Sequence, residues 1–319
     1  GDASHVTDAV LLAQALQRPV KVIYTREDGF ANDFFRPASQ SRIKAGLNKE
    51  GGLVGWSHKV AAPSVWSRLA PGMVKNGVCP DAVSGIRDMP YSIPNHRVDY
   101  VMVDLPIPVG FWRSVGFSVN GFAVESFMDE LAHAAGKDPV QFRLAHMEKG
   151  SRPYNILSLL AEKGGWNSPV PNGRARGVAV NACFESFAAH MAEVSVAKNG
   201  AVTVHKIVCA IDCGTAVYPD AIRAQAEGGA IMGMSTAFHE RVRFENGGVK
   251  TVNYDDYPLL TMSEVPEIEV HIAKNNLKPG GVGEPVLPSV APAIANAIFK
   301  ATGVRLREIP FQRELLVKG

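Results

Sequence analysis

The sequence predicts an α+β fold of mixed helices and β-hairpins, and three observations lead to this prediction. Segments with helical apolar periodicity recur along the whole chain, and β-patterned runs lie between them. Several of these runs flank hairpin turns such as Asn199-Gly200 and Asn246-Gly-Gly248. Helices and hairpins alternate without the regular strand–helix–strand rhythm of a parallel sheet, which favours α+β over α/β.

The expected helices carry apolar residues at three- and four-residue spacing. They cover residues 6–16, 120–135, 138–147, 156–163, 219–234 and 292–302. Ser4 is a suitable N-cap for the first helix, Asp138 caps the third before Pro139, and Gly136 and Gly303 stop two others. Because the chain begins at Gly1, directly before the first helix, we expect a processed piece or one chain of a larger assembly, with a cloning boundary as the alternative.

The expected strands are rich in β-branched residues and are bounded by Gly, Pro, Asn or Asp. They cover residues 18–26, 41–47, 52–61, 96–105, 178–181, 192–197, 202–211, 241–244, 249–251 and 268–272. An acidic turn, Glu27-Asp28, should follow the first strand, and residues 62–95 should form an irregular surface excursion. The 319 residues suggest about two domains, which we place at residues 1–150 and 151–319.

Charge and composition exclude several classes of protein. Lys and Arg total 33 and Asp and Glu total 31, so the formal charge of +2 argues against a nucleic-acid partner. The apolar stretches are too short to predict a membrane-spanning helix. Cys209 and Cys213 stand close together without further ligands, so we expect buried or adventitious free thiols rather than a zinc site.

The segment Lys278-Pro-Gly-Gly-Val-Gly-Glu-Pro285 is the first candidate for chemistry. Its glycines would let the backbone approach a ligand closely, and its prolines would stiffen the flanks. A single carboxylate, Glu284, on such a loop suits a general base. A tight loop with a solvent-facing Glu284 is the alternative. The segment matches neither phosphate-binding loop motif, so a generic nucleotide-binding protein is disfavoured.

Two further segments combine polar residues with glycines. Arg113 follows two aromatic residues in Pro108-Val-Gly-Phe-Trp-Arg-Ser-Val-Gly116 and could orient a carbonyl or stabilise an oxyanion. It could equally pair with Glu125 or Asp129. In Gln225-Ala-Glu-Gly-Gly229, close helix packing explains the glycines but leaves the polar Gln225 unexplained.

These segments together resemble the xanthine dehydrogenase/aldehyde oxidase family of molybdenum hydroxylases. The Phe-Trp-Arg-Ser motif is similar to the isoquinoline 1-oxidoreductase beta subunit and related membrane-linked aldehyde dehydrogenases. The likeness runs from residue 1 to about 313, with its motifs in matching order. They are Phe111–Ser114, Glu125–Glu130, Gly136–Pro139, Asp212–Gly214, Gln225–Gly229, Gly281–Pro285, Val290–Ile298 and Ala301–Gly303.

The resemblance implies two molybdopterin-binding domains. Residues 1–150 would be the C-terminal part of the first domain, and residues 151–319 would be the second. The implied cofactor is Mo-molybdopterin cytosine dinucleotide. The implied reaction is oxidation of an aldehyde or an N-heteroaromatic carbon with oxygen from water. Glu284 would be the catalytic base, and Arg113 would orient the substrate.

Four further residues would contact the cofactor by resemblance: Gln225, Gly281, Val282 and Gly283. Ser186 is a weaker candidate, because Glu185 stands where the family often has glycine. No residue of this chain is implied as a metal ligand. Phe111 and Trp112 would either narrow the substrate pocket or stack on an aromatic ring, so the aldehyde and the N-heterocycle both stay open.

The resemblance also implies partners. The family's Gly-Gly-x-Phe-Gly and Gly-Gln-Gly cofactor loops are missing, so we expect an N-terminal molybdopterin-binding chain to supply them. A [2Fe-2S] subunit should accept electrons, because four scattered cysteines match no cluster spacing, and cytochrome c is a possible further acceptor. A periplasmic or membrane-associated location follows from the resemblance alone, with a cytoplasmic one as the alternative. A non-catalytic scaffold that keeps the fold is the competing function.

Overall fold

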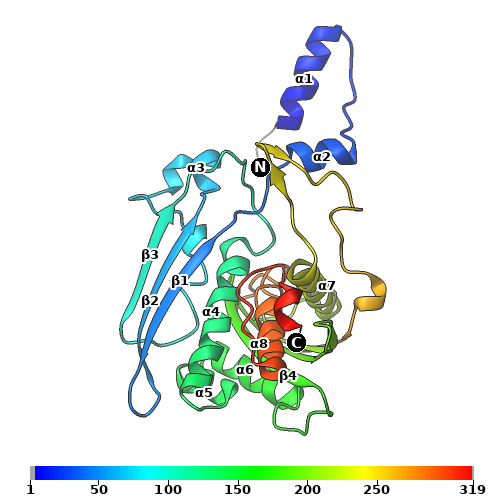
Figure 1. The fold of residues 1–319 in the computed structure, drawn as a ribbon. Helices are drawn as coiled ribbons and strands as arrows, with labels where there is room; N and C mark the ends of the chain where they lie inside the picture. Colours follow the sequence, from blue (N-terminus) through cyan, green and yellow to red (C-terminus); the bar gives the residue numbers. More distant parts are fainter. Residues whose placement is uncertain (1–3, 318–319) are drawn as a thin grey trace.

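The computed structural model describes residues 4–317, and its fold is α+β, as predicted (Figure 1). The helices are α1 (Ser4–Leu16), α2 (Arg26–Asn32), α3 (Trp66–Leu69), α4 (Val115–Ala134), α5 (Pro139–Ala145), α6 (Arg152–Lys163), α7 (Pro219–Phe238) and α8 (Val290–Thr302). The strands are β1 (Gln40–Leu47), β2 (Leu53–Ala62), β3 (His96–Met102), β4 (Ala175–Cys183), β5 (Ser186–Val196), β6 (Val202–Asp212), β7 (Phe244–Glu245), β8 (Gly248–Val249) and β9 (Glu267–Ile272).

The first sheet has the order β1-β2-β3. Strands β1 and β2 form the predicted antiparallel hairpin, and β3 returns to pair with β2 in parallel. Helix α4 covers the sheet, where Trp56 of β2 meets the ring of Phe127 edge-on at a centroid distance of 5.3 Å. The long excursion between β2 and β3 contains only short helical turns, as its Pro, Gly and Ser content predicted.

The second sheet, in the order β4-β5-β6-β9, is covered on both faces. Val178 and Met191 belong to the core that includes α6, whereas Ala179 and Ala192 belong to the core with α7 and α8, because neighbouring residues of a strand point to opposite faces. Helix α8 lies very close to β4. A Cβ atom on Gly177 would stand 2.2 Å from the backbone nitrogen of an α8 residue, so only glycine permits this approach.

A buried ion pair ties the two halves of the chain together. Glu125 of α4 accepts hydrogen bonds from Arg143 Nε at 2.9 Å, from the backbone nitrogen of Val180 at 3.0 Å and from the hydroxyl of Tyr91. Glu125 and Arg143 are both almost completely buried. The pair therefore joins α4 and α5 to β4 and leaves little freedom between the helical layer and the second sheet.

The strand expected over residues 18–26 is wrong. Residues 19–25 belong to no helix or sheet, and Arg26 already begins α2. Helix α2 begins here because Thr25 and Asp28 form a capping box, in which each side chain accepts from the other's backbone nitrogen. The expected acidic turn, Glu27-Asp28, is therefore the first turn of a helix, where carboxylates favourably meet the helix dipole.

The remaining differences concern where elements begin and end. Helix α4 begins five residues before the expected position 120, β4 and β5 are longer than predicted, and β7 and β8 have two residues each. Ser4, the expected N-cap, is already the first described residue of α1, and residues 1–3 lie outside the described residues. Within residues 4–317, no helix has both the length and the apolar character required to cross a bilayer.

Candidate functional site

The loop formed by residues 278–285 lies between β9 and α8, where several elements end together. Its backbone is hydrogen-bonded to two of them. Gly280 donates its N–H to the carbonyl oxygen of Cys213, at the end of β6, over 2.8 Å. Gly281 donates to the carbonyl oxygen of Phe184, in the β4–β5 turn, over 2.9 Å. These two hydrogen bonds fix one side of the loop. Its glycines are half-buried or exposed and so remain accessible from the other side.

Ser186 lies behind this loop. Its side chain is completely buried, and its Oγ donates to the carbonyl oxygen of Gly281 at 2.6 Å. A Cβ atom on Gly280 would stand 2.5 Å from the same Oγ, so Ser186 and the loop fit closely. Ser186 therefore acts by positioning Gly281, and its direct contact with a cofactor stays a prediction.

Arg113 connects the loop to α7. Its Nε donates to the carbonyl oxygen of Gly283 at 2.6 Å, and its Nη2 donates to Gln225 Oε1 at 2.9 Å. The alternative pairing of Arg113 with Glu125 or Asp129 is wrong, because those carboxylates bind Arg143 and other buried cations. The structure thus brings together three of the residues that the sequence singled out.

Glu284 completes this cluster. Its Oε1 accepts from the backbone nitrogen of Ser114 at 3.2 Å, and the Ser114 hydroxyl donates to the Glu284 carbonyl oxygen at 2.6 Å. The alternative of a solvent-facing Glu284 is wrong, since the residue is half-buried and bound at two points. Its Oε2 accepts no hydrogen bond from the described residues, so this oxygen can accept a proton from a ligand.

The backbone at Ser114 is strained. Ser114 and Val115 have φ angles of 72° and 41°, in the left-handed region that β-branched residues such as Val115 rarely occupy. This conformation turns the backbone nitrogen of Ser114 toward Glu284 just before α4 begins. Strained backbone that persists in a folded protein is often found at functional sites, and here it aims a donor at the candidate base.

Arg113 and Glu284 are the two charged groups of this cluster, and each affects the other. Burial lowers the pKa of Arg113, and the nearby Glu284 carboxylate opposes this shift. The Glu284 carboxylate thus favours the charged form of the guanidinium. Cys183, at the end of β4, is also close: burial raises the pKa of its thiol, and the charge of Glu284 raises it further. All four cysteines are buried free thiols.

Helix α7 presents Gln225 because its glycines let it lie against the segment that leads into α8. A Cβ atom on Gly229 would stand 2.6 Å from a side-chain carbon of Val286, and one on Gly233 would stand 2.8 Å from Val290. Close packing thus explains these glycines, and the contact with Arg113 explains Gln225. Its side-chain nitrogen makes no hydrogen bond with the described residues and is available to a ligand.

Sequence reasoning missed a buried chain of polar groups beneath the loop. Asn181 donates through Nδ2 to the carbonyl oxygen of Pro285 at 3.1 Å, and Ser289 donates to Asn181 Oδ1 at 2.7 Å. His190 Nδ1 lies 2.8 Å from Ser289 Oγ and must be the donor, because the serine proton is already used. These residues lie on β4, β5 and the start of α8, and no local motif indicated them.

A second group missed by the sequence analysis is centred on Arg152. Its Nη2 donates to Asp212 Oδ1 at 2.8 Å, and its Nη1 donates to the carbonyl oxygen of Glu185 at 3.0 Å. Burial alone would raise the pKa of Asp212, but hydrogen bonds from Arg152 and from the Gly214 nitrogen outweigh it and lower the pKa. Arg152 therefore fixes the β4–β5 turn and the end of β6, the two segments to which the loop is hydrogen-bonded. The only sequence signal for this group was Asp212 in the Asp-Cys-Gly motif.

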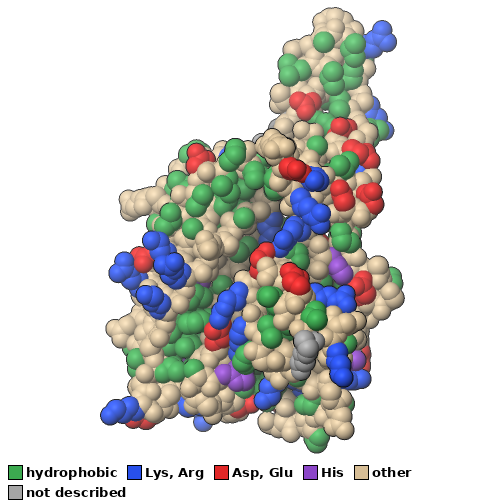
Figure 2. All heavy atoms as spheres, viewed as in Figure 1, with side chains coloured by type: hydrophobic (Ala, Val, Ile, Leu, Met, Phe, Trp, Pro, Cys, Tyr) green, Lys and Arg blue, Asp and Glu red, His purple; other side chains and the backbone are tan. Residues whose placement is uncertain are grey.

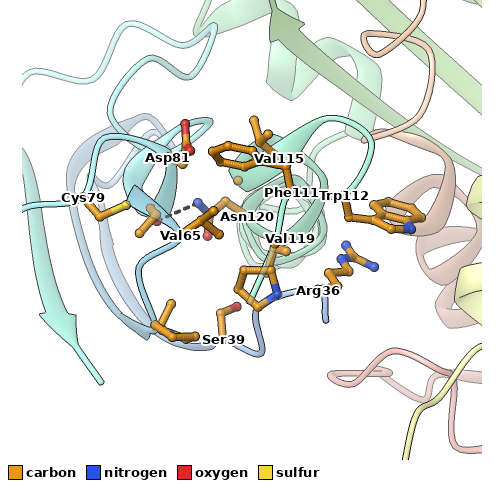
Figure 3. A pocket seen from close by; sticks show the side chains of 16 residues that line it. Arg36, Ser39, Val65, Cys79, Asp81, Phe111, Trp112, Val115, Val119 and Asn120 are labelled. Carbon is orange, nitrogen blue, oxygen red and sulfur yellow. Dashed lines mark hydrogen bonds between the residues drawn. The ribbon is translucent and has the colours of Figure 1, made fainter. Parts of the chain in front are cut away.

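A cavity lies on the other side of the segment that carries Arg113. Figure 3 shows Phe111, Trp112, Val115 and Asn120 on its walls, with Arg36 beside Trp112. The Arg36 guanidinium lies over the Trp112 ring, 4.2 Å from its centroid, which is a cation–π contact. The Trp112 ring thus lies on the wall of this cavity, in contact with a cation, and its role toward a substrate stays a prediction.

No group of three or more His, Cys, Asp or Glu side chains within residues 4–317 forms a candidate metal site. The cluster described above instead offers hydrogen-bond donors, one cation and one carboxylate. Such a set can hold an organic ligand and accept a proton from it.

Comparisons with known proteins give this cluster a context. Two family models, both described as a molybdopterin cofactor-binding domain, match residues 3–147 and 125–266. The isoquinoline 1-oxidoreductase beta subunit of Brevundimonas diminuta is 34% identical over 316 residues, which cover 97% of this chain and 40% of that protein. A protein of Gluconacetobacter polyoxogenes, named a membrane-bound aldehyde dehydrogenase (pyrroloquinoline-quinone), is 32% identical over 347 residues, which cover 100% of this chain and 45% of that protein.

Among solved structures, quinoline 2-oxidoreductase from Pseudomonas putida 86 superposes with a TM-score of 0.82 at 13% identity. The match covers 96% of this chain and 65% of that one, and at this identity it shows a shared fold. The chain spans less than half the length of either curated relative.

Proposed function

Because the chain belongs to the xanthine dehydrogenase family of molybdenum hydroxylases, matching their molybdopterin cofactor-binding domains, we propose that it is the C-terminal part of a catalytic subunit. The reaction is oxidation of an aldehyde or an N-heteroaromatic substrate with oxygen from water. The names of the two curated relatives support these two substrate classes. The single observation that carries the proposal is the convergence of Glu284, Arg113 and Gln225 on one loop.

The residues of the loop fit a pterin-type cofactor. The backbone nitrogens of Val282 and Gly283 form no hydrogen bond with the described residues, and Gln225 has a free side-chain nitrogen. Gly281 is exposed and lacks a side chain that would block a ligand. Pterin rings and their phosphates are rich in acceptors, so this set of donors suits them. Gln225, Gly281, Val282 and Gly283 would hold the cofactor in this chain.

Both family models describe a molybdopterin cofactor, so we assign molybdopterin rather than the pyrroloquinoline quinone in one relative's name. The cytosine dinucleotide form is part of the proposal. When bound, the molybdenum cofactor supplies a two-electron redox centre for oxidation of the substrate carbon.

Glu284 and Arg113 would have different roles toward the substrate and cofactor. Glu284 accepts a proton at Oε2, while the Ser114 nitrogen holds Oε1 in place. Arg113 is held by its contacts with Gly283 and Gln225, and among the described residues its Nη1 has only the sulfur of Met232, at 4.0 Å, as a partner. Nη1 can therefore orient a substrate carbonyl or ring nitrogen and stabilise negative charge that develops there.

We further propose that other polypeptides complete the enzyme. An N-terminal molybdopterin-binding chain would supply the rest of the cofactor site, and the name of the isoquinoline relative, a subunit, supports a multi-chain enzyme. A [2Fe-2S] subunit would accept the electrons, with cytochrome c as a further acceptor. A periplasmic or membrane-associated location is part of this proposal and is supported by the name of the membrane-bound relative.

The test uses the assembled enzyme with Glu284→Gln and a matched control, Glu185→Gln, on the neighbouring exposed turn. We expect kcat to fall by about 10²–10⁴-fold for Glu284→Gln with unchanged molybdenum and pterin content, and to stay near wild type for the control. Full turnover by Glu284→Gln would remove this residue from its assigned role. A wild-type assembly that holds neither molybdenum nor pterin would favour a non-catalytic scaffold.

A further inference from the structure

Arg36 is an unusual cation in this molecule. Figure 2 shows Lys and Arg side chains spread over the visible face, several of them beside Asp or Glu. Arg36 is instead half-buried, and it forms no ion pair with any residue between 4 and 317. Burial lowers its pKa to about 10, although Glu240 and Tyr257 oppose this shift. Burying a cation without a paired carboxylate costs free energy, so the contacts that Arg36 does make require an explanation.

These contacts lie on both sides of the strained turn before α4. Arg36 Nη2 donates to Ser118 Oγ at 3.0 Å, and Ser118 Oγ donates to the carbonyl oxygen of Val115 at 2.9 Å. On the other side, the guanidinium lies over the Trp112 ring, whose own backbone carbonyl oxygen accepts from the Val115 nitrogen at 2.8 Å. Figure 3 shows Arg36 beside Trp112. Arg36 therefore connects the two ends of the turn.

The backbone around Arg36 keeps it in this position. The Phe35 nitrogen donates to the carbonyl oxygen of Pro108 at 2.9 Å, and the Gly110 nitrogen donates to the carbonyl oxygen of Phe35 at 2.9 Å. A Cβ atom on Gly110 would stand 2.6 Å from Phe34 Cβ, so the two segments fit closely. Arg36 is thus fixed to the residues that lead into the turn.

The turn does not favour its own conformation. Ser114 and Val115 have φ angles of 72° and 41°, which glycine adopts readily and other residues rarely do. Helix α4 also has no side-chain hydrogen bond at its N-cap that would stabilise its first turn. If Val115 returned to a right-handed conformation, the Ser114 N–H would turn away from Glu284 Oε1, to which it donates at 3.2 Å. Contacts from outside the turn must therefore hold it.

We propose that Arg36 is a positioning residue for the candidate base. Through Ser118 and Trp112 it holds the left-handed turn that directs the Ser114 N–H toward Glu284. In one respect the inference rests on the proposed function, namely that Glu284 is the base. Arg36 differs from Arg113, which contacts the loop directly. Loss of Arg36 should therefore slow the chemical step and leave substrate binding unchanged.

Steady-state kinetics of the assembled enzyme test this role. Arg36→Met keeps an unbranched side chain but removes the charge and the donors. We expect kcat to fall about 10–100-fold, with KM within about threefold of wild type and unchanged molybdenum and pterin content, because a misplaced base slows turnover without weakening binding. Arg42→Met, on the exposed side of β1, is the matched control and should turn over like wild type. An unchanged kcat, or a raised KM with unchanged kcat, would overturn the proposal.

Ser118→Ala tests the connection with a smaller change, which also covers the case that Arg36→Met does not fold. It removes one oxygen atom, and kcat should fall at least about fivefold, because Arg36 then no longer reaches the Val115 carbonyl oxygen. In the double variant, kcat should fall no further than in Arg36→Met, since both changes break the same connection. Effects that multiply would refute action through Ser118.

Hydrogen exchange of the Ser114 amide in the same assemblies needs no turnover. Arg36→Met should make this buried amide exchange at least tenfold faster, whereas the Met128 amide in the middle of α4 should keep its rate. Faster exchange of Ser114 in an assembly that lacks molybdenum and pterin would support the positioning of the turn and refute the proposed function. Equal exchange in a loaded, active assembly would support the function and refute the positioning role.

Discussion

Lowering the pH from 7 to 5 should destabilise the folded chain, because two of its histidines are buried as neutral rings. His190 is completely buried, and burial lowers its pKa to about 3. His58 is also completely buried, and burial, with a smaller effect from His96, lowers its pKa to about 4. An unfolded histidine has a pKa of 6.5. Between these values, the unfolded state binds protons that the folded state excludes.

The sign and the size of the effect follow from proton linkage. Because the unfolded chain binds more protons, the free energy of unfolding falls as the pH falls below about 6.5, at about 1.4 kcal/mol per pH unit for each histidine. Above that pH both states are neutral at these positions and the contribution is absent. From pH 7 to pH 5, each ring therefore costs about 2 kcal/mol, and the pair costs about 4 kcal/mol.

Urea unfolding of the chain at pH 7, 6 and 5 measures this loss. His190→Gln and His58→Gln should each reduce the loss between pH 7 and 5 by about 2 kcal/mol, whatever they do to stability at pH 7. His5→Gln, on the exposed α1, is the matched control. A His190→Gln variant whose loss equals that of wild type would refute the reasoning. The effect reaches the candidate site, because His190 holds Ser289 beneath the loop.

Two further predictions concern single contacts. Glu125→Gln removes the carboxylate that lies 2.9 Å from the buried guanidinium of Arg143 and leaves Asp129, at 4.0 Å, as the remaining carboxylate, so the free energy of unfolding should fall by about 3–5 kcal/mol in urea at pH 7. A change below about 1 kcal/mol would show that the pair is not needed. Gly280→Ala places a methyl group 2.5 Å from Ser186 Oγ, so the loop should shift, with a cost of about 1–3 kcal/mol and reduced turnover in the assembled enzyme. Gly228→Ala, whose Cβ would meet no atom within 4 Å, is the control, and equal turnover of the two variants would contradict the proposed fit.

The sequence predicted most helices and hairpins because their signals are local. Asn199-Gly200 indicated the β5–β6 turn, and Gly303 indicated the end of α8, since both residues act through the conformation of their own backbone. The strand expected over residues 18–26 failed for a different reason. A strand needs a neighbour to pair with, and β-propensity cannot supply one. The start of α4 was misplaced because it depends on the strained Ser114, which no propensity favours.

At the candidate site, too, local features could be predicted and contacts between distant segments could not. Motifs indicated Glu284, Arg113 and Gln225, because each stands in an unusual run of glycines or aromatic residues. Their mutual contacts could not be predicted, since Arg113 and Gly283 are 170 residues apart and meet only after α4, α7 and α8 have packed. The free energy that positions the loop thus comes from the core rather than from the loop's own residues. It follows that substitutions behind the loop, at Arg152 for example, should impair turnover before they unfold the chain.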